Sequence, residues 1–142
     1  MGEDAQSETT GAANPQELLR RLSRETAKIQ KDAFGKGPVS VRSYLFDDLL
    51  LVVMRDGLTV AEKTMLEFGQ ADLVRSFRQT FENEMTSRFV DMVEQVTTRK
   101  VLTYQSQIMF DPDVVIEIFV FDRELGGGFD SAEIRGEGED PV

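Results

Sequence analysis

A lysine flanked by two glycines, Gly35-Lys36-Gly37, is the feature of this sequence best suited to binding a ligand. Consecutive backbone N–H groups around glycines can form a concave nest for an anion, and the lysine adds positive charge. A nucleotide-binding P-loop is not indicated, because no Ser or Thr follows the lysine and no glycine precedes the motif at the required spacing. The structural alternative is that Gly35 ends a helix and that Gly37 and Pro38 lead into a strand.

Two arginines could complete an anion site at this corner of the chain. Arg42 follows Pro38 closely, and Arg78 lies near the start of a long predicted helix, three residues after Arg75. If that helix begins near the glycines, guanidinium groups and free N–H groups would together bind a small oxyanion. The alternative is that these arginines are solvated and pair with the many carboxylates. The predicted anion-binding residues are Gly35, Lys36, Gly37, Arg42 and Arg78.

The chain has 26 carboxylates, and few of them have a distinctive environment. A magnesium-dependent enzyme would need a cleft that brings together at least two of Asp48, Asp111 and Asp113. Glu82 and Glu84 are two residues apart on a predicted helix and do not face each other. Glu117 stands among apolar residues, so either burial raises its pKa or it guards a sheet edge against aggregation.

The chain contains neither histidine nor cysteine. This composition excludes disulfides, thiolate nucleophiles and zinc sites of the Cys/His type, and it removes the commonest general base near neutral pH. A serine nucleophile would have no histidine partner, and no Ser-x-x-Lys pattern occurs. We therefore predict a protein that is not an enzyme, with no catalytic residues, no cofactor and no metal site.

The net charge of −10 is concentrated at the two ends of the 142-residue chain, with −3 in residues 1–13 and −4 in residues 123–142. This acidity argues against nucleic acid or an anionic membrane as a partner. No signal peptide is visible, and the longest aliphatic run, at residues 49–54, is far shorter than the ~20 residues that span a bilayer. We predict a soluble, cytoplasmic protein that does not insert into the membrane.

Capping and turn signals define the elements that must position these residues. A helix is predicted over residues 14–34. Thr59 and Glu62 form a capping box for a short helix that ends at Gly69. A long helix with an apolar stripe rich in phenylalanine follows over residues 71–97. Strands are predicted over residues 39–46, 49–54, 101–110 and 114–121.

The predicted fold class is α+β, a two-layer sandwich in the order α-β-β-α-α-β-β, with a mostly antiparallel four-stranded sheet and helices on one face. Residues 1–13 are predicted to be a flexible N-terminal segment, residues 14–122 a single α+β domain, and residues 123–142 a disordered acidic tail. The strand over residues 49–54 is apolar on both faces, so both faces should be covered. Because helices cover only one, we predict a homodimer in which a second subunit covers the other.

Taken as an ordered set, these segments resemble the MpsC-type family, small bacterial proteins otherwise known as a domain of unknown function. The likeness covers about residues 18–121. One departure is Thr98, where a glycine is expected before the Arg-Lys-Val run, at the turn from helix to strand. The likeness is carried by Gly35-Lys36-Gly37-Pro38, Asp48 and the strand after it, Leu58-Thr59 with Glu62, Gly69, Val74, Arg78, Phe81, residues 99–101, and Asp111-Pro112-Asp113 leading to Phe119.

The resemblance implies a soluble accessory or regulatory role beside a membrane-potential-generating system. The other components of that system resemble an ion-translocating complex-I-type subunit and an inorganic-carbon-transport partner. The resemblance transfers no catalytic residues. The predicted function is a non-enzymatic interaction module, with a membrane-complex subunit as a candidate partner. The alternative is a small-anion sensor, for bicarbonate or a phosphate-type anion, at the corner formed by residues 35–38.

Overall fold

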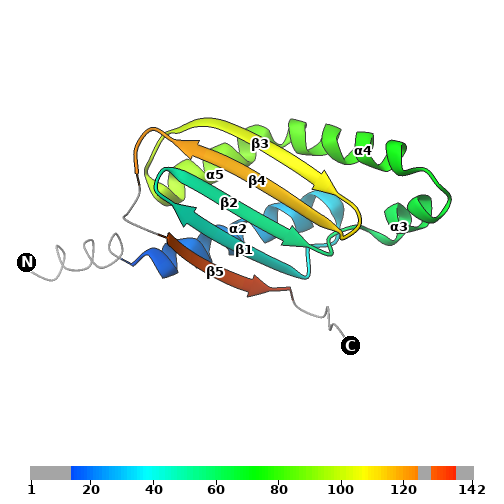
Figure 1. The fold of residues 1–142 in the computed structure, drawn as a ribbon, viewed down its shortest axis with the longest axis horizontal. Helices are drawn as coiled ribbons and strands as arrows, with labels where there is room; N and C mark the ends of the chain where they lie inside the picture. The colour runs from blue at the N-terminus through cyan, green and yellow to red at the C-terminus, as the bar shows by residue number, and fades with distance from the viewer. Residues whose placement is uncertain (1–13, 125–128, 137–142) are drawn as a thin grey trace, which may run out of the picture.

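Five antiparallel strands form one sheet in the computed structural model, which describes residues 14–124 and 129–136 (Figure 1). The strands are β1 (Ser40–Phe46), β2 (Leu49–Arg55), β3 (Val101–Met109), β4 (Val114–Phe121) and β5 (Phe129–Arg135). Across the sheet their order is β3-β4-β2-β1-β5. The two predicted hairpins, β1–β2 and β3–β4, therefore join through the central pair β2–β4.

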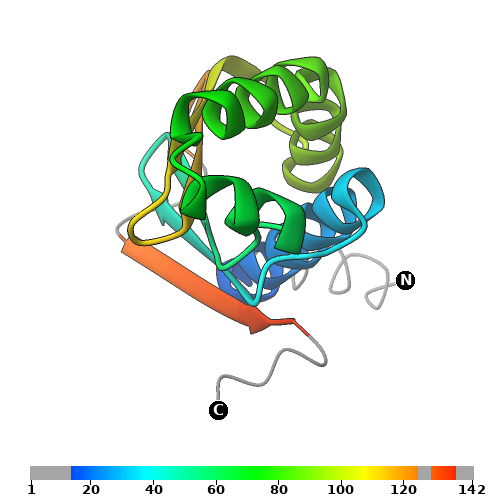
Figure 2. The ribbon, with the colours of Figure 1, turned by 90° about the vertical axis from the view of Figure 1, so that its right-hand side faces the viewer.

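The described helices all lie on one side of this sheet (Figure 2). They are α2 (Pro15–Phe34), α3 (Val60–Glu67), α4 (Ala71–Glu84) and α5 (Thr86–Thr97). Helix α2 packs on β1 and β5 and also against α5, whereas α4 and α5 lie over β3. The predicted α+β sandwich with helices packed on a sheet is confirmed.

Local capping interactions set the ends of the helices, as the sequence predicts. The side chain of Asn14 accepts a hydrogen bond from the N–H of Glu17 at the start of α2. Gly35 ends that helix with a φ of +79°, in the left-handed region that favours glycine. Thr59 and Glu62 form the reciprocal capping box of α3, each accepting a hydrogen bond from the other's backbone N–H.

The hydrophobic core lies between the helices and the facing side of the sheet. Alternate residues of β2 point into it, because successive side chains of a strand point to opposite faces. The largest fully buried apolar side chains are Leu19, Leu22, Leu50, Phe89, Phe119 and Phe121. Burial of one such side chain stabilises the fold by about 1.5–3 kcal/mol, so the core can hold both layers together.

The fifth strand corrects the prediction of a four-stranded sheet followed by a disordered tail over residues 123–142. Residues 129–135 instead pair with β1 along its whole length, from Phe46 opposite Phe129 to Ser40 opposite Arg135. Ala132 is buried, and the half-buried Ile134 packs against the core. The physical reason is that β1 would otherwise leave its backbone N–H and C=O groups unpaired at a sheet edge. The predicted flexible segment, residues 1–13, and residues 137–142 of the tail lie outside the described residues.

The long helix predicted over residues 71–97 is two helices, because α4 ends and α5 begins at Met85. The predicted apolar stripe is buried in α5 but not at the start of α4, where Leu73 and Phe77 are 54% and 49% exposed. Helix α4 instead turns a row of residues spaced by four toward the interior. That row consists of Val74, Arg78 and Glu82, and its two polar members have partners on α3 and α2.

Candidate functional site

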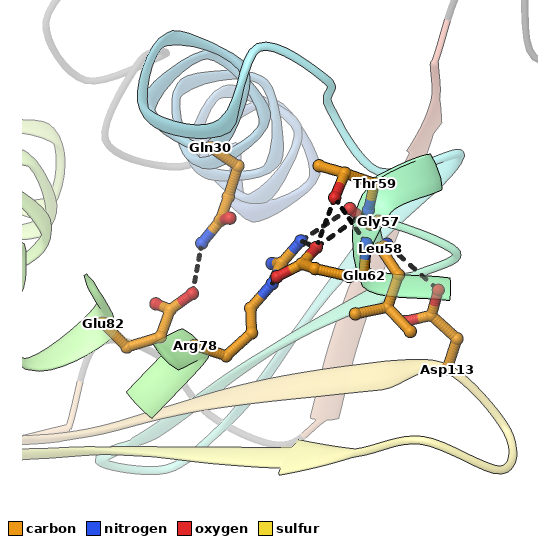
Figure 3. Close-up of polar contacts among 8 residues, drawn as sticks. All are labelled: Gln30, Gly57, Leu58, Thr59, Glu62, Arg78, Glu82 and Asp113. Atoms are coloured by element: carbon orange, nitrogen blue, oxygen red, sulfur yellow. Dashed lines mark hydrogen bonds and ion pairs between the residues drawn. The ribbon is translucent and has the colours of Figure 1, made fainter. Parts of the chain in front are cut away.

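Arg78 of α4 is buried at the junction of three helices, with 2% of its side chain exposed. Its Nε and Nη2 atoms donate to the two carboxylate oxygens of Glu62, at 2.7 and 2.8 Å (Figure 3). Nη2 also donates to the carbonyl oxygen of Gly57 at 2.8 Å, and the guanidinium carbon lies 3.8 Å from the ring centroid of Phe34. Arg78 therefore braces α3 and α4 against the end of α2, and its charge is neutralised within the protein.

The carboxyl group of Glu62 responds to two opposing effects. Burial alone would raise its pKa, but the hydrogen bonds from Arg78 and from Thr59 outweigh burial and hold the pKa of Glu62 below its usual value. Glu62 is thus an ionised, saturated partner that serves both the helix cap and the arginine. The pair is part of the framework and offers no vacant cation for a ligand.

The aspartates considered for a magnesium site lie near opposite ends of β4. Asp113 directly precedes the strand, whereas the carbonyl oxygen of Asp48 accepts the N–H of Phe121 at its far end. An eight-residue strand spans about 26 Å, so Asp48 cannot share a cation with Asp111 or Asp113. Asp113 is also engaged, because its Oδ2 accepts the N–H of Leu58 at 3.1 Å, and burial raises its pKa. In the described ranges, no three His, Cys, Asp or Glu residues are grouped to hold a metal ion.

Two glutamates meet in the interior between α4 and the sheet. Glu117 of β4 and Glu82 of α4 are both fully buried, and their carboxyl groups lie within hydrogen-bonding reach of each other. Tyr104 and Ser106 of β3 donate hydroxyl hydrogen bonds to the two carboxylate oxygens of Glu117. Gln30 of α2 donates to Oε2 of Glu82 at 3.0 Å (Figure 3), but Oε1 of Glu82 has no donor.

Burial and the neighbouring charge of Glu82 raise the pKa of Glu117 well above its usual value. A proton held between the two carboxyl groups would remove their repulsion and give Oε1 of Glu82 a partner. Of the two readings of Glu117, the raised pKa is confirmed, and the sheet edge is wrong because β4 lies between β3 and β2. Glu82 was missed as its partner, although its spacing of four from Arg78, which is itself four from Val74, places all three on one helix face.

A cationic cleft of about 640 Å³ opens between the C-terminal half of α2 and the end of β5. The cleft contains Gly35, Lys36 and Gly37, the predicted corner. Its other charged lining residues were not predicted, and they come from two elements that are distant in sequence: Arg24, Lys28, Lys31 and Arg135. The first three recur at steps of four and three on α2, which is a readable helical pattern. The fourth depends on β5, which was not predicted.

The three cationic residues of the predicted anion site, Lys36, Arg42 and Arg78, already interact with groups of the protein, and the two arginines lie outside the cleft. The ammonium group of Lys36 donates to the carbonyl oxygen of Asp56 at 2.8 Å and to that of Gly37 at 3.4 Å. Arg42 pairs with Glu133 at 3.0 Å, and alternation along β1 turns it away from the buried Val41 and the helices. Arg78 is held by Glu62, as described above. The structure thus brings Gly35, Lys36 and Gly37 together and leaves the two predicted arginines outside the cleft.

The side of the sheet opposite the described helices, here called the second sheet face, is apolar at its centre. Leu51 and Val53 of β2 lie beside Ile118 and Ile116 of β4 in the register of the two strands. All four are only partly buried. A groove of about 620 Å³ runs over this face, lined among others by Leu51, Val53, Met109 and Ile116. The prediction that residues 49–54 are apolar on both faces agrees with this arrangement.

Comparison with models of known protein families identifies the family of this chain. The model of the family described as "Na+-translocating membrane potential-generating system (MpsC)" matches residues 14–123. The chain belongs to the MpsC family. The matched region contains four helices and β1 to β4, and it ends before β5.

A distant relative and the search of solved structures complete the comparisons. The chain is 21% identical over 100 residues to the uncharacterised protein YrhF of Bacillus subtilis. The aligned region covers 69% of this chain and 82% of the relative. No solved structure matches. None of the helices in residues 14–124 and 129–136 combines the length and apolar character that crossing a bilayer requires.

Thr98 occupies the position where the MpsC pattern is expected to have glycine. It is the residue after α5, and its φ of +55° lies in the left-handed region. Glycine adopts this region without strain, whereas a β-branched residue adopts it at a cost. The turn from α5 to β3 therefore holds a β-branched residue in a strained backbone conformation.

Proposed function

We propose that this MpsC-family protein is a cytoplasmic, non-enzymatic accessory or regulatory module that acts by binding other polypeptides, first of all a second copy of itself. The proposal rests on one observation, the apolar centre of the second sheet face. Sheets whose strands are apolar on both faces are normally covered on both. The described helices cover one face, and we propose that a second subunit covers the apolar centre of the other.

The distribution of polar residues on the second sheet face supports this role. The apolar strands β2 and β4 are flanked on one side by β3, which carries the exposed Thr103, Gln105 and Gln107. On the other side the Arg42–Glu133 ion pair joins β1 and β5. An apolar centre with a polar border is the usual composition of a protein interface.

The size of the face is also suitable. Five strands about 4.8 Å apart and about seven residues long make a face of roughly 24 by 23 Å. This projected size is of the same order as the ~800 Å² of accessible surface that each partner buries in a standard interface. Two copies could therefore pair face to face through it.

Association with a membrane system is the finer part of the proposal. The family description names a Na+-translocating membrane potential-generating system. We propose that the module docks on an ion- or inorganic-carbon-translocating subunit of such a system. Affinity purification of the full chain from cells should then recover that subunit, and its absence from the purified material would refute this part of the proposal.

Light scattering and sedimentation of the purified protein test the homodimer. The wild-type protein should be a dimer, and Leu51→Lys or Ile116→Lys should make it monomeric while circular dichroism reports a folded chain. Val60→Lys is the matched control, because Val60 is 76% exposed and lies on α3. A monomeric wild-type protein, or a dimer that survives both lysines, would refute pairing through the second sheet face.

The second candidate function is a small-anion sensor for bicarbonate or phosphate, and the cationic cleft around residues 35–38 favours it. The glycines of the predicted corner line this cleft together with cations from α2 and β5. Calorimetric titration with each anion, repeated on Lys36→Ala, tests this candidate. Absence of heat with every anion at millimolar concentration would remove it.

A further inference from the structure

We infer that the cationic cleft binds a ligand carrying two or more phosphate groups, and not a single small oxyanion. This inference rests on the second candidate function and specifies its ligand. Among the described residues, the lining contains five cationic side chains and no carboxylate. In a chain with a net charge of −10, such a local excess of positive charge runs against the overall composition and attracts anions.

Most of these cations are available for a ligand. Neither Lys28 nor Lys31 has an ion-pair partner among the described residues. Arg24 and Arg135 pair only loosely, at 3.6 Å with Glu17 and at 3.9 Å with Glu133, and both side chains are about half exposed or more. Exposed pairs of this kind contribute little stability, so an incoming phosphate can replace the carboxylates.

The end of α2 explains only part of this charge. Cations in the last turns of a helix are favourable because they offset the partial negative charge of its C-terminus, and this accounts for Lys28 and Lys31. It does not account for Arg24, which lies further from the helix end, or for Arg135, which comes from β5. The convergence of a helix and a strand on one cleft is what a ligand-binding site requires.

The spacing of the cations indicates an extended ligand. Arg24, Lys28 and Lys31 span seven residues of one helix, which is about 10 Å along its axis. A single bicarbonate or phosphate can contact only one part of such a row. A ligand with several linked phosphate groups can contact the whole row and Arg135 opposite, so its charges would be matched by several side chains at once.

Gly35 lets a ligand approach the backbone in the lining of the cleft. Gly35 has no atom within 4 Å of the position where a side chain would begin, so its surroundings are open. Gly136 is packed against the carbonyl oxygen of Pro38, which holds the end of β5 against the loop. Lys36 remains bound to backbone carbonyls and contributes a fixed positive charge.

Titration of the full chain with tripolyphosphate, orthophosphate and bicarbonate at near-physiological salt tests the inference. Tripolyphosphate should bind at least about tenfold more tightly than either small anion, because several cations act together. In ¹H–¹⁵N spectra it should shift the amide signals of Gly35, Gly37 and Gly136. The amide of Gly69, which also has a positive φ but lies outside the cleft, should not move.

Charge reversal provides the matched comparison. The double variant Lys28→Glu/Lys31→Glu should lose about tenfold or more of the affinity for tripolyphosphate, whereas Lys63→Glu/Lys100→Glu, with the same change in net charge at exposed positions outside the cleft, should bind like the wild type. Equal losses in both variants, or no binding of tripolyphosphate, would overturn the inference.

The outcomes also separate the inference from the functions on which it builds. If orthophosphate or bicarbonate bound as tightly as tripolyphosphate, the multi-phosphate ligand would be refuted and the small-anion sensor would stand. If no anion bound, both would fall. The proposal of a homodimer would stand in either case, because it is argued from the second sheet face.

Discussion

Replacing Glu82 with glutamine tests whether the buried carboxyl pair retains a proton. Glutamine has the shape of a protonated glutamic acid. Its amide nitrogen can donate to Glu117 from the position of Oε1, which has no donor in the wild type, while its oxygen still accepts from Gln30. The variant therefore supplies permanently the hydrogen bond that a proton shared by the two carboxyl groups would supply in the wild type.

The magnitude follows from proton linkage. The pKa of Glu117 is raised in the folded protein relative to an ordinary value of 4.5. The resulting stabilisation is fully present below the unfolded pKa and is lost as pH rises toward the folded pKa. Where only the folded state holds this proton, each rise of one pH unit lowers the free energy of unfolding by about 1.4 kcal/mol. Glu82→Gln should therefore gain stability relative to the wild type as the pH rises above 4.5, by at most about 1.4 kcal/mol for each pH unit, until the folded pKa is reached.

Urea denaturation followed by circular dichroism at a series of pH values measures this gain. Glu84→Gln is the matched control, because Glu84 is exposed on the same helix, two residues away. Its stability should follow that of the wild type at every pH. Stability curves for Glu82→Gln and the wild type that stay parallel at every pH above 4.5 would show that the pair retains no proton, and the reasoning would fail.

Three further substitutions probe other parts of the fold, each measured by denaturant unfolding. Thr98→Gly should stabilise the protein by about 1 kcal/mol, because the φ of +55° is strained for threonine; a loss of stability would contradict this. Arg78→Met should destabilise by about 3–5 kcal/mol by leaving Glu62 buried without its partner, and adding Glu62→Met should recover part of that loss. Gly136→Ala would place a side-chain carbon 2.5 Å from the carbonyl oxygen of Pro38, so amide exchange in β5 should accelerate; unchanged protection would exclude this close packing.

The ends of helices and the first four strands could be predicted because their signals are local. The Asn14 cap, the left-handed Gly35 and the Thr59–Glu62 box each involve backbone groups within four residues. The fifth strand has no such signal, because its pairing is with the edge of β1, far away in sequence. The break at Met85 is likewise invisible locally, since the apolar spacing runs through it without interruption.

In the candidate site, too, features with local signals could be predicted, whereas contacts between residues distant in sequence could not. The glycine corner could be found from sequence, whereas its neighbours depend on how α2 and β5 pack. Arg78 looked like a free cation because the sequence does not show that Glu62 faces it across two helices. Glu82 was considered only together with Glu84, because its actual partners come from α2 and β4. Polar residues whose partners are distant in sequence were therefore the ones most often misjudged.

Strand β1 connects the two proposed binding surfaces. Its successive residues point to opposite sides of the sheet, so Val41 faces the helices while Arg42 lies on the second sheet face and pairs with Glu133 of β5. The same β5 contributes Arg135 and Gly136 to the cationic cleft, and it lies outside the region matched by the family model. A multi-phosphate ligand that held the end of β5 would also hold the strand that borders the proposed dimer interface. Ligand and dimer would then stabilise each other, since any coupling between two binding equilibria is reciprocal.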